Sequence, residues 1–170
     1  MILLISLVFI LFASFFLQTG VFSMIPYFTS PNLLLVCTFT VAILRGQDTG
    51  MLFGAATGLL LDLTGGGVFG FYGMIYMYIG YGCGLLNQHI SIDTPFVPFF
   101  VCIGCEVIYH FYIFLFRFVL RGRLGLPVYF QDIILPELVI STVFALFIYG
   151  LLHFLNDRLE AYEERRALIA

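Results

Sequence analysis

The sequence predicts an all-α fold, a bundle of about six helices that cross a membrane. Of the 170 residues, 62% are hydrophobic and only 10% are charged, and the mean hydropathy is +1.09. A soluble domain carries about 25% charged residues. The apolar residues also lie in long runs that brief polar segments separate. We therefore expect residues 1–170 to form a single integral membrane domain without a soluble domain.

Six apolar segments are each expected to form one helix. A helix rises about 1.5 Å per residue, and about 20 residues cross a hydrocarbon core of about 30 Å. The last three segments are long enough, whereas the second and third are short, so five crossings are an alternative to six. The segments are Ile2–Leu17, Asn32–Leu44, Thr49–Leu63, Val68–Leu86, Phe96–Leu120 and Ile133–Leu155.

The two ends of the chain predict its orientation. Ile2–Leu17 lacks the basic start and the small-residue cleavage site of a signal peptide, so we expect it to be retained as a span. Residues 156–170 form a polar tail, expected to continue the last helix into water. With six crossings, both termini share a side with Arg45 and three tail arginines, and three arginines lie on the other side. Arginine excess marks the cytoplasmic side, so we expect both termini in the cytoplasm.

A row of glycines ending in an acid is the most specific feature of the central segments. Gly50, Gly54, Gly58 and Asp62 are spaced four residues apart in the third segment. At this spacing they share one side of a helix, where glycines allow another backbone to approach closely. A charged residue at the middle of a membrane helix costs about 3 kcal/mol, so Asp62 must find a donor, water or a partner chain. We expect this face to mediate helix packing or partner binding.

Polar side chains also share one face of the fifth segment. Cys102, Glu106, His110 and Arg117 fall in one stripe at helical spacing. We favour an internal polar network of Glu106, His110 and Arg117, in which Arg117 reaches the interface. A ligand cavity, a proton path and a metal site of Cys102, Cys105, Glu106 and His110 are the alternatives.

Other ionisable and thiol residues have structural explanations. Glu137 lies in the first turn of the last segment, where the helix dipole favours an acid. All four cysteines, including Cys37 and Cys83, lie in apolar segments and are expected to be packing residues without disulfides.

Recognisable catalytic motifs are missing from the sequence. It contains no G-x-S-x-G, no H-E-x-x-H, no P-loop and no dinucleotide fingerprint before a helix. No basic patch with interleaved aromatic residues occurs outside the tail, which disfavours nucleic-acid binding. We therefore expect no enzyme activity, no cofactor, no metal ion and no nucleic-acid partner.

The central third of the chain carries an ordered set of short motifs. The set comprises Pro31-Asn32-Leu33, Leu44-Arg45-Gly46, Gly58 followed by Asp62-Leu63, Thr64-Gly65 and Phe69-Gly70. In this order the motifs resemble those of the MreD family of rod shape-determining membrane proteins. Arg45, Asp62, Gly65 and Gly70 are the positions that match the family pattern. The resemblance implies that Gly65 and Gly70 belong, with the glycine row and Asp62, to the helix-packing or partner interface. Length and hydropathy resemble the family over the whole chain.

The resemblance implies a function and partners that composition and spacing do not show. MreD-like proteins are non-enzymatic scaffolds of the machinery that elongates bacterial cells. The implied partners are the single-span protein MreC, RodA, a class B penicillin-binding protein and the actin-like MreB, in a cell membrane. The implied fold is similar to the S-components of energy-coupling-factor transporters. An S-component-like carrier of a vitamin or lipid precursor is therefore the alternative function.

Overall fold

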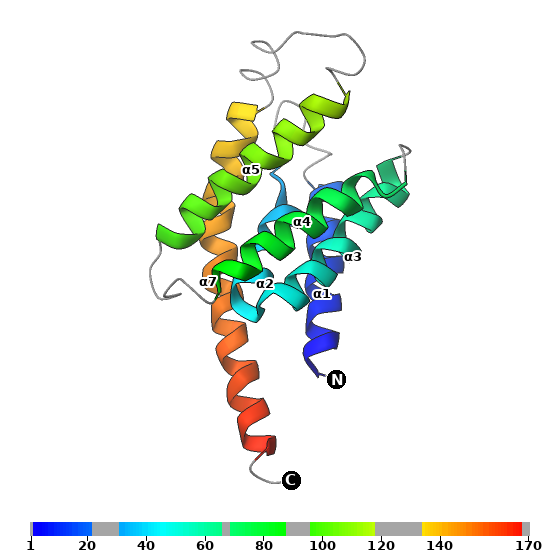
Figure 1. Ribbon diagram of the computed structural model, residues 1–170. Helices are drawn as coiled ribbons and strands as arrows, with labels where there is room; N and C mark the ends of the chain where they lie inside the picture. The colour runs from blue at the N-terminus through cyan, green and yellow to red at the C-terminus, as the bar shows by residue number, and fades with distance from the viewer. Residues whose placement is uncertain (1, 22–30, 66–68, 88–95, 118–133, 168–170) are drawn as a thin grey trace.

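The computed structural model describes residues 2–21, 31–65, 69–87, 96–117 and 134–167, and these residues form helices and turns without strands (Figure 1). Each of the six predicted segments corresponds to one α-helix. The all-α prediction is therefore confirmed. The helices are α1 (Ile2–Phe16), α2 (Leu33–Arg45), α3 (Gln47–Gly65), α4 (Phe71–Leu86), α5 (Phe96–Arg117) and α7 (Leu135–Ala167), with a π-helical extension of α1, η1 (Leu17–Val21).

The short helix α2 is the centre of the bundle. Every side chain from Leu33 to Ile43 is buried, and α2 contacts α1, α3, α4, α5 and α7. A helix that is apolar on all sides is typical of a core position. Its length of 13 residues is therefore explained by enclosure within the bundle, since a buried helix need not match the membrane thickness.

Specific residues set both ends of α2. Asn32 caps the first turn, where its side-chain Oδ1 accepts the backbone N–H of Leu35 at 3.3 Å. Gly46 ends the helix with a positive φ of +87°, and its N–H donates to the carbonyl of Ala42 at 2.9 Å. Glycine adopts this conformation at little cost. The turn at Gly46 therefore lets α3 begin at once and pack back against α2.

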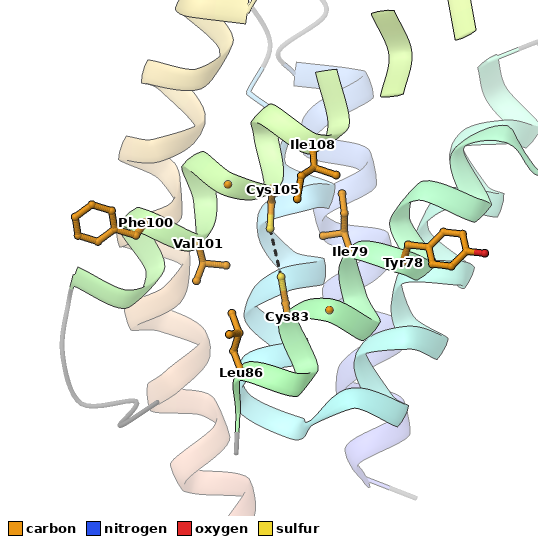
Figure 2. A pocket seen from close by; sticks show the side chains of 10 residues that line it. Tyr78, Ile79, Cys83, Leu86, Phe100, Val101, Cys105 and Ile108 are labelled. Atoms are coloured by element: carbon orange, nitrogen blue, oxygen red, sulfur yellow. Dashed lines mark hydrogen bonds between the residues drawn. The ribbon is translucent and has the colours of Figure 1, made fainter. Parts of the chain in front are cut away.

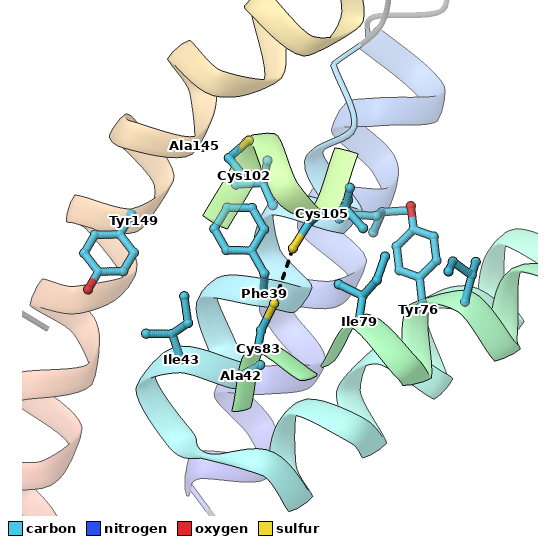
Figure 3. Packing of buried hydrophobic residues seen from close by; sticks show 14 residues of the cluster. Phe39, Ala42, Ile43, Tyr76, Ile79, Cys83, Cys102, Cys105, Ala145 and Tyr149 are labelled. Carbon is cyan, nitrogen blue, oxygen red and sulfur yellow. Dashed lines mark hydrogen bonds between the residues drawn. The ribbon is translucent and has the colours of Figure 1, made fainter. Parts of the chain in front are cut away.

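The largest hydrophobic cluster lies where α2, α4, α5 and α7 meet (Figure 3). Phe39 of α2, Tyr76 of α4, Cys105 of α5 and Ala145 of α7 are all buried in it. A second cluster joins α1, α3 and α7 to the other side of α2. Its buried members are Leu11, Cys37, Val41, Phe53 and Leu152.

The outer faces of the bundle are apolar. Phe9 of α1, Phe100 of α5 and Phe147 of α7 each expose about 70% of their surface. Such extensive apolar exposure marks a surface that contacts a membrane or a partner. Two stretches, Pro98–Phe116 and Leu135–Phe154, are long and apolar enough to cross a membrane. Helix α7 continues beyond the second stretch to Ala167, through the polar tail.

Candidate functional site

The glycine row of α3 faces α4 of the same chain. A Cβ atom added at Gly50 would lie 2.7 Å from the carbonyl oxygen of Gly80, and one at Gly58 would lie 2.6 Å from Cα of Gly73. At Gly54, the added atom would also meet the α4 backbone. The three glycines therefore bring the two backbones into direct contact, as small residues do between membrane helices.

Asp62 caps the beginning of α4. Its Oδ1 accepts the backbone N–H of Tyr72 at 3.0 Å, and its Oδ2 accepts those of Gly70 and Gly73, each at 3.0 Å. The first N–H groups of a helix have no partner within the helix, and the helix dipole favours a negative charge there. The carboxylate is 7% exposed and has protein donors. Asp62 thus fastens the end of α3 to the start of α4.

The two other glycines of the predicted interface lie at the ends of these helices. Gly65 is the last residue of α3. Gly70 is the N-cap residue of α4 and has a φ of +91°. Residues with a Cβ atom rarely adopt a positive φ. Gly70 therefore combines a left-handed turn with an N–H group that donates to Asp62.

A cluster of two carboxylates and one imidazole lies between α5 and α7, with Glu106 and His110 buried and Glu137 partly exposed. His110 Nε2 lies 3.4 Å from Glu106 Oε2 and 3.6 Å from Glu137 Oε2. Glu106 is fully buried, and His110 is 2% exposed. The Arg117 side chain, expected in this network, lies outside the described residues. Instead, the structure adds Glu137, which sequence analysis had explained by the helix dipole alone.

Hydrogen bonds also connect α4 and the start of α2 to α7. The Tyr76 hydroxyl of α4 donates to Asn32 Oδ1 at 2.8 Å, and the Asn32 N–H donates to Ser141 Oγ of α7 at 2.9 Å. Ser141 lies one turn after Glu137. This arrangement was not predicted, because spacing along one helix says nothing about polar residues on separate helices.

The cysteines pack within the bundle. All four are buried and free, and the Sγ atoms of Cys83 and Cys105 lie 3.3 Å apart. Cys102 contacts Thr142. Among the described residues, the group of possible metal ligands contains Glu106, His110 and Glu137 but neither Cys102 nor Cys105. The structure therefore gives no support to the cysteine-containing metal site weighed from the sequence.

An apolar groove of about 500 Å³ lies between α4 and α5 (Figure 2). Two glycines line it, Gly82 on α4 and Gly104 on α5, and a Cβ atom added at either would meet nothing within 4 Å. The other lining residues are Tyr78, Ile79, Cys83, Leu86, Phe100, Val101, Cys105 and Ile108. No side chain in this set is charged, so the groove suits an apolar occupant.

Comparison with protein families identifies the family to which this chain belongs. A family model described as rod shape-determining protein MreD matches residues 1–155. The chain belongs to the MreD family. The match extends the resemblance from the central motifs to every helix from α1 to α5 and to most of α7. Comparison of this MreD chain with curated proteins and with solved structures found no match.

Membership in the MreD family indicates the general role of this protein. MreD is a membrane protein family with a role in rod shape determination, and it is associated with the rod-shape machinery. It is not known as an enzyme family. The expected similarity to S-components stays a prediction, because no solved structure matches.

Proposed function

We propose that this MreD protein is a multi-pass, non-enzymatic scaffold that binds the transmembrane helix of MreC in the groove between α4 and α5. Through MreC, it would help to position RodA and a class B penicillin-binding protein along the MreB system. The main observation that supports the proposal is the apolar groove itself. It has one glycine on each wall, Gly82 on α4 and Gly104 on α5, with open space at both.

The groove has the chemistry that a membrane helix requires of its partner. Lipid and apolar side chains are equally hydrophobic, so helices in a membrane associate by close packing, and small residues favour it. Gly82 and Gly104 leave room for the side chains of an incoming helix. A single-span protein such as MreC offers an apolar helix of this kind.

The glycine row of α3 is less suited to the same partner. Its backbone face is already covered by α4, from Gly50 to Gly58. A partner helix could use that face only by separating α3 from α4 and breaking the three hydrogen bonds of Asp62. We therefore assign the row and Asp62 to holding α4 in place, so that its opposite face can form one wall of the groove.

The carrier alternative has weaker support from the same geometry. Its motivation was a polar stripe that could line a ligand cavity. Glu106 and His110 are instead buried beside Glu137, and none of these three side chains lines the groove. A water-soluble vitamin would need polar partners that the groove lining lacks.

Co-purification with MreC tests the proposal. Gly82→Leu combined with Gly104→Leu fills the groove, and we expect recovery of MreC on the tagged protein to fall by about tenfold or more, which corresponds to about 1.4 kcal/mol. Gly150→Leu is the matched control, since Gly150 also has open space around it but lies on α7 outside the groove.

Two further readouts complete this test. The double variant should elute from size exclusion as the wild type does, which shows that the bundle is intact, and cells that depend on it should lose rod shape. Recovery of MreC at the wild-type level by a folded double variant would refute the proposed docking site.

A further inference from the structure

We propose that Glu106, His110 and Glu137 bind a divalent transition-metal ion of the zinc class and that this ion joins α5 to α7. The three side chains offer two carboxylate oxygens and one imidazole nitrogen, all within 4.8 Å of one another. Oxygen and nitrogen ligands of this kind bind Zn²⁺ in proteins.

The distances within the cluster suit ligands around a shared ion better than a hydrogen-bonded network. Both carboxylates approach the same nitrogen, at 3.4 Å and 3.6 Å. An N–H···O hydrogen bond is typically about 2.9–3.0 Å long, and one ring nitrogen carries at most one hydrogen. In a tetrahedral site with bonds of about 2.0–2.2 Å, the ligand atoms lie about 3.3–3.6 Å apart. The two distances from His110 Nε2 fall in that range, and the carboxylate oxygens of Glu106 and Glu137 lie within 4.8 Å of each other.

Burial supplies an independent argument. Glu106 is fully buried, and neither of its carboxylate oxygens has a hydrogen-bond partner among the described residues. A buried carboxylate without such partners is strongly unfavourable unless a cation or a proton neutralises it. Glu106 therefore requires a neutralising group at its own position, on the side that faces His110.

The charge of the cluster matches a divalent cation. Two ionised carboxylates and a neutral imidazole carry a net charge of −2, and a divalent ion makes the site neutral. Two protons would also make the cluster neutral, and the metal titration distinguishes the two cases.

Such an ion would act as a structural link. Glu106 and His110 lie one turn apart on α5, whereas Glu137 lies in the first turn of α7. An ion bound by all three would fix α5 relative to α7. Because α5 also forms one wall of the groove, the site would stabilise that wall without contacting a partner in the groove.

Metal titration of the purified protein tests the inference. Wild-type protein in detergent, first treated with a chelator, is titrated with Co²⁺ as a spectroscopic probe and then with Zn²⁺. We expect one Co²⁺ per chain, visible ligand-field bands without thiolate charge-transfer bands, displacement by Zn²⁺ and a higher unfolding temperature with Zn²⁺.

Variants show whether the proposed ligands are responsible. Glu106→Gln and Glu137→Gln keep the side-chain size but remove a charged ligand, and each should weaken Co²⁺ binding by about tenfold or more and abolish the thermal shift. Cys102→Ala and Asp48→Asn are controls and should bind as the wild type does. Asp48 is an exposed acid on α3.

Two results would overturn the inference. If the wild type shows no saturable binding of either ion, protons neutralise the cluster and no metal site exists. If binding persists unchanged in both glutamine variants, the ion binds elsewhere. The titration uses the chain alone, so its result is independent of whether MreC occupies the groove.

Discussion

The carboxylate of Asp62 in α3 accepts the backbone N–H of Gly73 in α4 at 3.0 Å. Gly58, one turn before Asp62, packs on the backbone of the same residue. Asp62 and the glycine row therefore act together to hold α3 against α4. An acid in an apolar segment needs no catalytic explanation when three backbone donors of a helix start surround it.

Removing this acid should destabilise the fold. Asp62→Ala leaves buried N–H groups at the start of α4 without acceptors, and we expect the free energy of unfolding to fall by about 2–3 kcal/mol. Unfolding in mixed detergent micelles with increasing dodecyl sulfate measures the change. Asp48→Asn should shift stability by less than about 0.5 kcal/mol, because that acid is exposed. Equal stability of Asp62→Ala and the wild type would show that the cap is unimportant.

Because the backbones of α3 and α4 are in contact, a single methyl group added between them should destabilise the fold. Gly54→Ala would push a Cβ against the backbone of Tyr76, and overpacking of this kind costs about 1–3 kcal/mol. Gly150→Ala adds the same methyl group on α7 where nothing lies within 4 Å. We expect it to be neutral or to stabilise the helix by up to about 1 kcal/mol. The same unfolding assay compares the two, and a smaller loss for Gly54→Ala than for Gly150→Ala would contradict the packing.

The hydrogen bond between Tyr76 and Asn32 should be measurable by a double-mutant cycle. Tyr76→Phe removes only the hydroxyl, and we expect a loss of about 1 kcal/mol. Asn32→Ala should cost more, since Asn32 also caps α2. The double variant should be more stable than the sum of the two losses predicts, by about 1 kcal/mol. Tyr78→Phe, on an exposed side chain, is the control. Simple additivity would mean that the two side chains do not interact.

Site-specific photo-crosslinking should locate the partner surface. A benzoylphenylalanine at Ile108, which lines the groove and is more than half exposed, should crosslink to MreC in membranes. The same group at Phe147 on α7 is more exposed but lies outside the groove, so it should crosslink mainly to lipid. Immunoblotting for MreC detects the product. Crosslinking from Phe147 and none from Ile108 would move the docking site to α7.

Local chemistry made the helices predictable. The apolar runs and the brief polar segments between them predicted where the helices lie, and the structure agrees within a few residues. Helical spacing also placed Gly54, Gly58 and Asp62 on one face, because the period of a helix does not depend on what packs around it. The motif order around these residues was enough to indicate the family that the comparison confirms.

The tertiary structure decided which helix meets which face. Sequence spacing could not show that α2 is the enclosed helix, that α4 covers the glycine row, or that Glu137 of α7 reaches His110 of α5. Contacts between helices depend on how whole surfaces fit together, and residues far apart in the chain have no common spacing to reveal them. The sequence by itself determined the helices, their apolar character and the acid that needed a donor. Packing decided that the donor is the start of α4 and that the open groove lies on the other side of that helix.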